Sequence, residues 1–155
     1  MIDIAELISP RAVVPSLRVA SKRQLLQELA KRAAPLAGLD EKLILDTLLE
    51  RERLGSTGIG SGTAVPHGRF ASLTRMFALF ARLEKPIPFE SVDDQPVDLV
   101  FLLLTPDNAG ADHLKALARL SRLLRDQATC AKLRGTDRAE ALYALLTDRA
   151  ASHAA

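Results

Sequence analysis

The segment from Gly55 to Arg69 combines glycine, small hydroxyl residues and one histidine, which are residue types suited to phosphate chemistry. It reads GSTGIGSGTAVPHGR, and residues 55–62 hold four of the chain's eight glycines. Glycine lets backbone N–H groups approach an anion closely, and hydroxyl groups add further donors. His67 follows on a turn between a proline and a glycine, and an imidazole nitrogen can itself form a bond to phosphorus. The segment therefore predicts a phosphate-handling loop with a reactive histidine; the alternative is an exposed turn histidine without a function.

The two common phosphate loops of nucleotide-binding proteins do not match this segment. A P-loop requires lysine directly after its second glycine, and the chain has Ser61 after Gly60. The dinucleotide fingerprint that would include Gly58 requires a further glycine where Thr63 stands. Nucleotide binding is therefore disfavoured, and covalent attachment of phosphate to the histidine is favoured.

Two further residues could complete such a site, and each has an ordinary structural alternative. His113 begins a predicted helix after a buried strand, where α/β proteins place ligand sites; otherwise it is a hydrogen-bonded histidine at the core edge. At the end of the helix before the glycine-rich segment, either Arg51 or Arg53 could hold two phosphate oxygens, although a basic residue there often only complements the helix dipole. A zinc site at the two histidines, with Asp107 or Asp112 as a third ligand, is a weaker alternative because no compact ligand motif exists.

The composition predicts one globular domain, residues 1–155, and disfavours several functional classes. The net charge is +2 and aromatic residues make up 4% of the chain, so no nucleic-acid-binding surface is expected. The one cysteine, Cys130, excludes an internal disulfide, is expected to be buried, and fits a reducing cytoplasm. We expect no membrane insertion and no signal peptide, because no apolar run is long enough to span and the first residues lack the signal pattern. No cofactor and no metal are expected.

Hydrophobic patterning predicts strands and helices in alternation. Strands are expected over residues 13–19, 76–83 and 97–105, the last of them buried on both faces. The glycine-rich segment is expected to form a loop with short extended pieces, and Pro86 and Pro88 are expected to break regular structure. Such a pattern predicts an α/β/α sandwich, in which a mixed β-sheet is flanked by helices on both faces.

Capping residues delimit the predicted helices. Ser21 and Asp40 are expected N-caps and Gly38 a C-cap, with the second helix ending near Arg53. Leu43, Ile44, Thr47 and Leu48 are expected on one side of that second helix. Further helices are predicted over residues 112–125, 129–133 and 138–146. Residues 148–155, which include His153, are expected to be a frayed tail.

These motifs resemble the active-site segment of the type-2 enzyme IIA proteins, the fructose/mannitol class of the bacterial phosphoenolpyruvate-dependent phosphotransferase system. The resemblance extends over about residues 8–146. The segments that carry it are GSTGIG at 55–60, AVPHGR at 64–69, PIPF at 86–89, QPVDLVF at 95–101 and HLKAL at 113–117. The family fold, a mixed sheet flanked by helices, agrees with the fold predicted from the patterning.

The resemblance implies a phosphocarrier and assigns three roles. The phosphoryl-accepting histidine falls on His67, the second active-site histidine on His113, and the phosphate-binding arginine on Arg51. A phosphorylated HPr-type carrier would be the donor. The loop is expected to add contacts to phosphate oxygens, and its candidate residues are Ser56, Thr57, Gly58, Gly60 and Ser61.

Within the family, the nitrogen-related branch is the most similar. Its members are free-standing, begin near the IDIAELI of residues 2–8, and regulate partners such as sensor kinases or potassium-transport proteins. Two residues depart from the branch pattern: Ser61 stands where asparagine or histidine is common, and Asp94 where glycine is common. Two alternatives stay open. One is an enzyme IIA of a fructose- or mannitol-type transporter that passes phosphate to a IIB domain, and the other is a binding module that is never phosphorylated.

Overall fold

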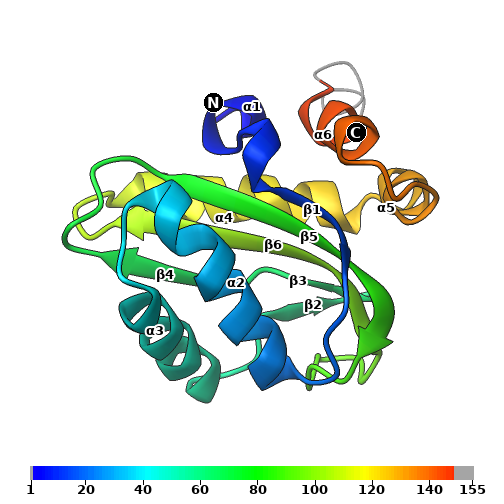
Figure 1. Cartoon of the computed structure of the whole chain (residues 1–155), viewed down its shortest axis with the longest axis horizontal. Coiled ribbons are helices and arrows are strands. Elements are labelled where there is room, and N and C mark those ends of the chain that lie inside the picture. Colours follow the sequence, from blue (N-terminus) through cyan, green and yellow to red (C-terminus); the bar gives the residue numbers. More distant parts are fainter. Residues whose placement is uncertain (1, 149–155) are drawn as a thin grey trace.

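The structure is a computed structural model that describes residues 2–148, and its centre is a six-stranded mixed β-sheet (Figure 1). Five strands follow one another across the sheet, in the order β1 (Val13–Leu17), β5 (Phe77–Ile87), β6 (Val97–Pro106), β3 (Thr63–Ala64) and β2 (Gly58–Gly60). The sixth strand, β4 (His67–Phe70), also pairs with β6.

Strand β6 holds the sheet together. It is antiparallel to β5 and parallel to both β3 and β4. All of its residues except Asp98 are buried, which confirms the prediction of a strand covered on both faces. In the register of β4 on β6, His67 lies opposite Leu103 and Arg69 opposite Thr105. The position of the predicted reactive histidine is therefore fixed by the most buried strand of the protein.

Helices cover both faces of the sheet, as predicted (Figure 1). Two helices, α2 and α3, lie over one face, and α4 lies over the opposite face with α5 and α6 after it. Two short elements before the first strand, α1 and the 3-10 turn η1, had no counterpart in the prediction. The bounds are α1 (Ile4–Leu7), η1 (Pro10–Ala12), α2 (Lys22–Ala37), α3 (Glu41–Arg53), α4 (Ala111–Arg125), α5 (Gln127–Arg134) and α6 (Ala139–Thr147).

The predicted caps are present at α2 and α3. The Ser21 hydroxyl accepts a hydrogen bond from the Gln24 N–H at 3.1 Å, and the Asp40 carboxylate accepts one from the Leu43 N–H at 3.0 Å. Gly38 ends α2 with a φ of 70°, the left-handed conformation typical of a glycine cap. These local signals place the end of α3, and with it Arg51, next to the glycine-rich segment.

Two details of the prediction are wrong. Pro86 lies inside β5, because the pairing with β1 ends at Leu83 and the β6 ladder is irregular between Arg82 and Ile87, so no partner requires its missing N–H. Leu43 is 46% exposed, because the buried face of α3 is centred on Ile44 and Leu48 and extends toward the partly buried Leu45 and Leu49.

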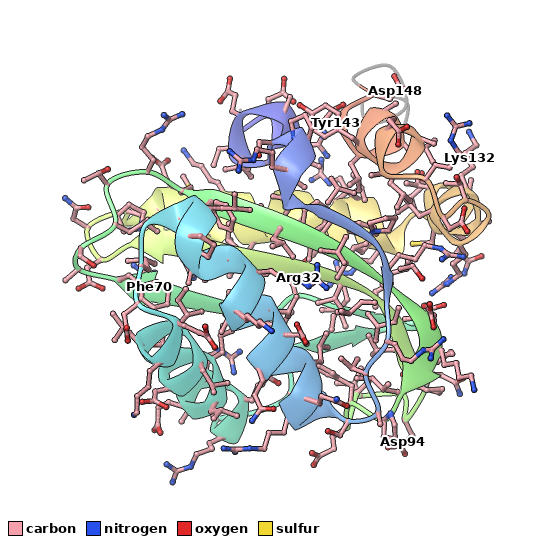
Figure 2. All side chains as sticks on the ribbon, in the orientation of Figure 1. Arg32, Phe70, Asp94, Lys132, Tyr143 and Asp148 are labelled. Atoms are coloured by element: carbon pink, nitrogen blue, oxygen red, sulfur yellow. The ribbon has the colours of Figure 1, made fainter. Side chains whose placement is uncertain are left out.

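Large apolar side chains fill the space between the sheet and its helices (Figure 2). Phe80 and Phe101 lie opposite each other on β5 and β6, with their rings edge to face at 5.3 Å. Cys130 is buried, as predicted. No helix within residues 2–148 is long and apolar enough to cross a membrane. The predicted tail, apart from Asp148, and His153 lie outside the described residues.

Candidate active site

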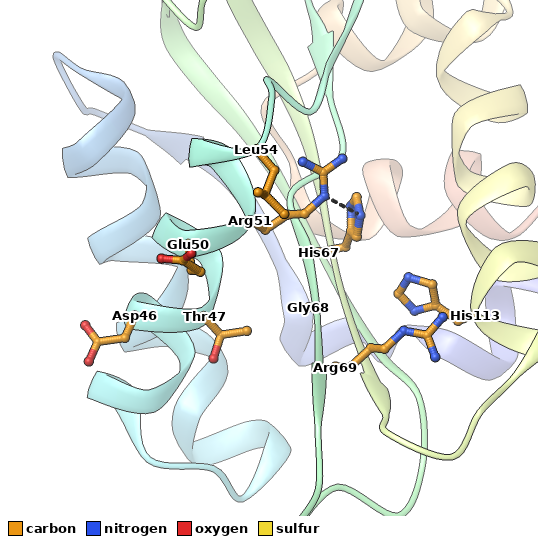
Figure 3. Close-up of a pocket in the computed structure, with 9 residues that line it drawn as sticks. All are labelled: Asp46, Thr47, Glu50, Arg51, Leu54, His67, Gly68, Arg69 and His113. Atoms are coloured by element: carbon orange, nitrogen blue, oxygen red, sulfur yellow. Dashed lines mark hydrogen bonds between the residues drawn. The ribbon is translucent and has the colours of Figure 1, made fainter.

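The C-terminal half of α3, strand β4 and the first turn of α4 enclose an open cavity of about 590 Å³ (Figure 3). Three predicted site residues, each from a different element, meet in it: Arg51, His67 and His113. The other lining residues are Asp46, Thr47, Glu50, Leu54, Gly68 and Arg69. The fold thus brings together two histidines that are 46 positions apart in the chain, from 67 to 113.

Both ring nitrogens of His67 have a partner, and these partners define its tautomer. Nδ1 lies 2.8 Å from the carbonyl oxygen of Val65, and Nε2 lies 3.2 Å from Nε of Arg51. The arginine nitrogen can only donate, so Nε2 carries the lone pair and Nδ1 carries the hydrogen that is donated to Val65. The imidazole therefore presents its nucleophilic nitrogen to the guanidinium that lines the cavity.

The surroundings of His67 favour the neutral ring. Burial of the half-buried side chain lowers its pKa, the hydrogen bond to the Val65 carbonyl opposes this, and the positive charge of Arg51 lowers the pKa further. A neutral imidazole is the form with a free electron pair, and this is the form required of a nucleophile.

Arg51 reaches the cavity from the last turn of α3. Besides its contact with His67, it donates from Nη1 to the carbonyl of Gly55 at 2.9 Å. Both partners are uncharged, so among residues 2–148 the guanidinium has no carboxylate partner. It keeps its full charge available for an anion in the cavity.

His113 is buried, with 5% of its surface exposed, and faces His67. The two ring centroids are 5.6 Å apart at an interplanar angle of 61°. The Thr105 hydroxyl lies 2.6 Å from Nδ1 of His113 and fixes the ring. Burial lowers the pKa of His113 to about 4, and the charges of Arg69 and His67 add to this effect. The second histidine is therefore a neutral group at the core edge that also lines the cavity.

The lowered pKa of His113 predicts a loss of stability in acid. The unfolded chain takes up a proton below the ordinary pKa of 6.5, whereas the folded chain takes it up only near 4. The free energy of unfolding is therefore expected to fall by about 3 kcal/mol as the pH drops through this window. His67 shifts in the same direction. Urea unfolding at a series of pH values measures the effect, and a His113→Gln variant, which cannot titrate, should show a shallower slope. The same dependence of unfolding free energy on pH in wild type and variant would contradict the prediction.

Gly68 sets the spacing between α3 and β4. A Cβ atom at this position would lie 2.8 Å from Cγ2 of Thr47 on α3, closer than real Cβ contacts allow. Because Arg51 belongs to α3 and His67 to β4, any side chain at position 68 would push the arginine away from the histidine. The glycine is required by this close approach of helix and strand.

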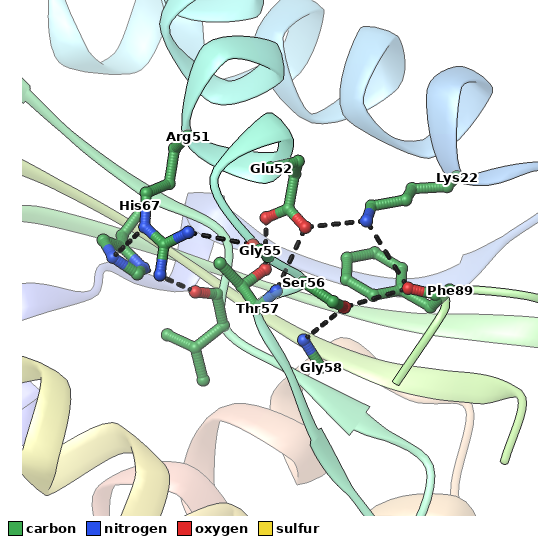
Figure 4. Close-up of polar contacts among 10 residues, drawn as sticks. Lys22, Arg51, Glu52, Gly55, Ser56, Thr57, Gly58, His67 and Phe89 are labelled. Atoms are coloured by element: carbon green, nitrogen blue, oxygen red, sulfur yellow. Dashed lines mark hydrogen bonds and ion pairs between the residues drawn. The ribbon is translucent and has the colours of Figure 1, made fainter. Parts of the chain in front are cut away.

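The predicted phosphate-loop residues do not line this cavity, because their polar groups are bonded elsewhere (Figure 4). The Ser56 hydroxyl donates to the Phe89 carbonyl at 3.0 Å and accepts from the Gly58 N–H at 3.1 Å. The Thr57 hydroxyl and N–H both donate to the carboxylate of Glu52, the N–H at 3.0 Å. These contacts tie this part of the segment to α3 and to the Phe89 loop, and its contacts to phosphate oxygens stay a prediction.

Gly60 ends β2, and Ser61 begins the turn that leads to β3, beside the start of β6. The Ser61 N–H donates to Asp93 at 2.9 Å, and its carbonyl accepts from Arg134 at 2.9 Å. The neighbouring Gly62 carbonyl accepts from the first residues of β6, whereas His67 pairs near the other end of that strand. This turn supports the sheet and lies outside the cavity.

Sequence reasoning missed two residues that shape the site. Arg69 lines the cavity because residues two apart on a strand share a face, so the alternation of β4 could have paired it with His67. The side chain of Glu52 is 6% exposed, forms an ion pair with Lys22 at 2.8 Å and accepts hydrogen bonds from Thr57. In the sequence it is one acid among several at a helix end, and no local signal marks it.

The zinc alternative has no ligand set in the described residues. Within residues 2–148, no group of three or more histidine, cysteine, aspartate or glutamate side chains lies close enough to hold a metal ion. The two histidines are instead hydrogen-bonded to protein groups, His67 to a carbonyl and an arginine and His113 to a threonine.

A mixed sheet flanked by helices, with two neutral histidines and an arginine at one cavity, is the arrangement expected of a phosphotransfer protein. The chain matches the family model described as "Phosphoenolpyruvate-dependent sugar phosphotransferase system, EIIA 2" over residues 6–149. The chain therefore belongs to the type-2 enzyme IIA family of this system. Proteins of this family pass phosphate to other proteins of the phosphotransferase system.

Relatives of this chain include nitrogen regulatory proteins and a sugar-specific component. A "Nitrogen regulatory protein" of Bradyrhizobium diazoefficiens is 57% identical over 143 residues, 92% of this chain and 94% of the relative. The crystal structure of nitrogen regulatory protein IIA-Ntr from Neisseria meningitidis has a TM-score of 0.88 at 34% identity, covering 93% of this chain and 99% of that one. A fructose-specific EIIA component of Haloferax volcanii is 36% identical over 115 residues, 74% of this chain and 75% of the relative. The resemblance seen in the sequence is thereby confirmed.

The two departures from the branch pattern both occupy left-handed backbone positions. Ser61 has a φ of 56° and Asp94 a φ of 58°. Glycine, asparagine and aspartate adopt this conformation most readily, which explains glycine as the common residue at position 94 and the tolerance of aspartate there. Both positions belong to loops beside the start of β6, so neither departure touches the cavity.

Proposed function

We propose that this protein is a histidine phosphocarrier of the nitrogen-related phosphotransferase system. It accepts a phosphoryl group on His67 from an HPr-type carrier of that branch, and its phosphorylation state decides which partner it binds. The observation that carries this proposal is the pair of contacts on His67, which fix its hydrogen on Nδ1 and leave the Nε2 electron pair beside Arg51 in an open cavity.

In the transfer step, the Nε2 electron pair of His67 attacks the phosphorus of a phosphohistidine on the donor. The new bond joins Nε2 to phosphorus, and the phosphorus–nitrogen bond of the donor breaks, with its electron pair returning to the donor imidazole. The hydrogen on Nδ1 stays in its bond to the Val65 carbonyl, where it supports the positive charge that develops on the ring. Such transfers depend mainly on positioning and electrostatic stabilisation.

Arg51 and His113 act on the oxygens of the transferring group. The arginine exchanges its contact with Nε2 for contacts with phosphoryl oxygens, which its planar fork of donors suits. The Thr105 hydroxyl lies 2.6 Å from Nδ1 of His113. With this hydroxyl as the donor, the hydrogen of the ring is on Nε2, from which it is donated to a phosphoryl oxygen. His113 therefore need not accept the phosphoryl group itself.

Phosphorylation changes the charge of the cavity by up to two negative units. That change is local, but it is large enough to alter which protein surface fits there. Sensor kinases and potassium-transport proteins are the proposed targets. The fructose-specific relative favours one second candidate, an enzyme IIA that passes the same phosphoryl group to a sugar-specific IIB domain.

Labelling with phosphoenolpyruvate tests the proposal. The protein is incubated with labelled phosphoenolpyruvate, enzyme I and either an HPr-type carrier of the nitrogen branch or one of the sugar branch. Acid-labile label from the nitrogen-branch carrier is expected. Transfer from the sugar-branch carrier and onward to a IIB domain would support the second candidate. No label from either donor would contradict phosphotransfer and support a module that acts by contact alone.

A further inference from the structure

A second arginine, Arg69, lines the same cavity. We propose that Arg69 binds the phosphoryl group on His67 together with Arg51, so that two guanidinium groups hold it; this inference rests on the proposed function. The two residues come from different elements, Arg51 from α3 and Arg69 from β4. Figure 3 shows the Arg51 guanidinium beside His67 and the Arg69 side chain extending toward His113.

Strand geometry directs Arg69 into the cavity. Residues 67 and 69 point to the same side of β4, whereas Gly68 between them faces Thr47 on α3. Arg69 also lies opposite Thr105 of β6, the residue whose hydroxyl fixes His113. Thr105 of β6 thus positions both residues, Arg69 through strand pairing and the His113 ring through its hydroxyl.

In the part of the chain that the structure describes, neither Arg51 nor Arg69 has a carboxylate partner. The two acidic residues of the lining are paired with other cations, Asp46 with Lys42 at 2.7 Å and Glu50 with Arg53 at 2.9 Å. Arg51 contacts only the neutral His67 ring and a backbone carbonyl. Within residues 2–148, the side chain of Arg69 makes no hydrogen bond and no ion pair. A dianionic phosphoryl group would meet two unpaired positive charges.

The histidines cannot supply this charge at neutral pH. His113 has a pKa of about 4 and is neutral, and the charge of Arg69 is one reason why. The ring offers an N–H group but no positive charge, so the arginines must compensate the phosphoryl oxygens. Because guanidinium groups stay charged at any physiological pH, this compensation does not depend on the protonation of either histidine.

Substitution of Arg69 tests the proposal through the stability of the phosphorylated form. In Arg69→Gln, the equilibrium constant for phosphoryl exchange with the donor carrier is expected to shift toward the donor by about ten- to a hundred-fold, the loss typical of one hydrogen bond to a charged group. Phosphorus NMR of the phosphorylated variant should show a raised second pKa of the phosphoryl group, because a nearby positive charge is gone. A merely structural arginine would not move this titration.

Arg75→Gln is the matched control, since Arg75 is also an exposed arginine but lines a different cavity. It should behave as wild type in both measurements. Arg69→Met, which keeps an apolar stem without the charge, repeats the test if the glutamine variant melts at lower temperature. Wild-type equilibrium and titration in the Arg69 variants would overturn the inference while leaving the proposed function intact. A wild-type protein that takes up no label would instead overturn the proposed function.

Discussion

Replacing His67 with alanine is expected to abolish phosphorylation of this protein by an HPr-type donor. The substitution removes Nε2, the atom to which the proposed phosphorus bond forms. His113 cannot take over efficiently, because its ring is buried and held by Thr105. The loss should therefore be complete within the detection of an acid-labile label.

The test is a labelling reaction with phosphoenolpyruvate, enzyme I and carrier, followed by acid treatment. His153→Ala is the control, because it removes the third histidine of the chain and should leave the label unchanged. A thermal melt checks that the His67 variant remains folded; its ring is only half-buried, so the fold should persist. Full labelling of a folded His67→Ala protein would show that another residue is the acceptor.

Replacing His113 with alanine is expected to slow transfer more than it lowers the final level of phosphorylation. The ring offers one hydrogen-bond donor to an oxygen whose charge grows during transfer, and removal of such a donor typically costs 10²–10³-fold in rate. His67 and Arg51 keep their direct contact, so acceptance itself should survive. Rapid-quench measurement of a single transfer from the phosphorylated carrier gives this rate separately from the equilibrium.

The His113→Gln variant distinguishes two roles of His113: hydrogen-bond donor to the phosphoryl group, or residue that only packs in the core. A glutamine can place an amide N–H near the position of Nε2, so it should recover part of the rate that alanine loses. The alanine variant is also expected to be less stable, because a buried ring and its bond to Thr105 are lost. Wild-type transfer rates in both variants would return His113 to a structural role at the core edge.

Much of the fold was predictable because its determining signals are local. The run of apolar residues in β6 and the caps at Ser21, Gly38 and Asp40 each act within a few positions. The path of β5 through Pro86 was not predictable, because it depends on where pairing with another strand stops. A proline has the same local preferences whether or not a partner needs its N–H.

For the candidate site too, features that depend on neighbouring residues were predictable, whereas features that depend on tertiary packing were not. Residue type, spacing and the family resemblance selected Arg51, His67 and His113 as candidates, and the fold brings them to one cavity. The hydrogen bonds of the Ser56 and Thr57 hydroxyls were not predictable, because their partners, a carbonyl beyond β5 and the Glu52 carboxylate, are determined by packing. A hydroxyl in a glycine-rich loop can bond a ligand or the protein, and composition alone does not decide between them.

The close approach of Gly68 to Thr47 sets how near α3, which carries Arg51, lies to β4, which carries His67. Gly68 and Thr47 also line the cavity that opens beside the proposed acceptor. A change in the size of either residue would therefore alter two things at once: the contact between Arg51 and His67, and the shape of the cavity that a partner meets. Reactivity and recognition are thus coupled at this point of the structure.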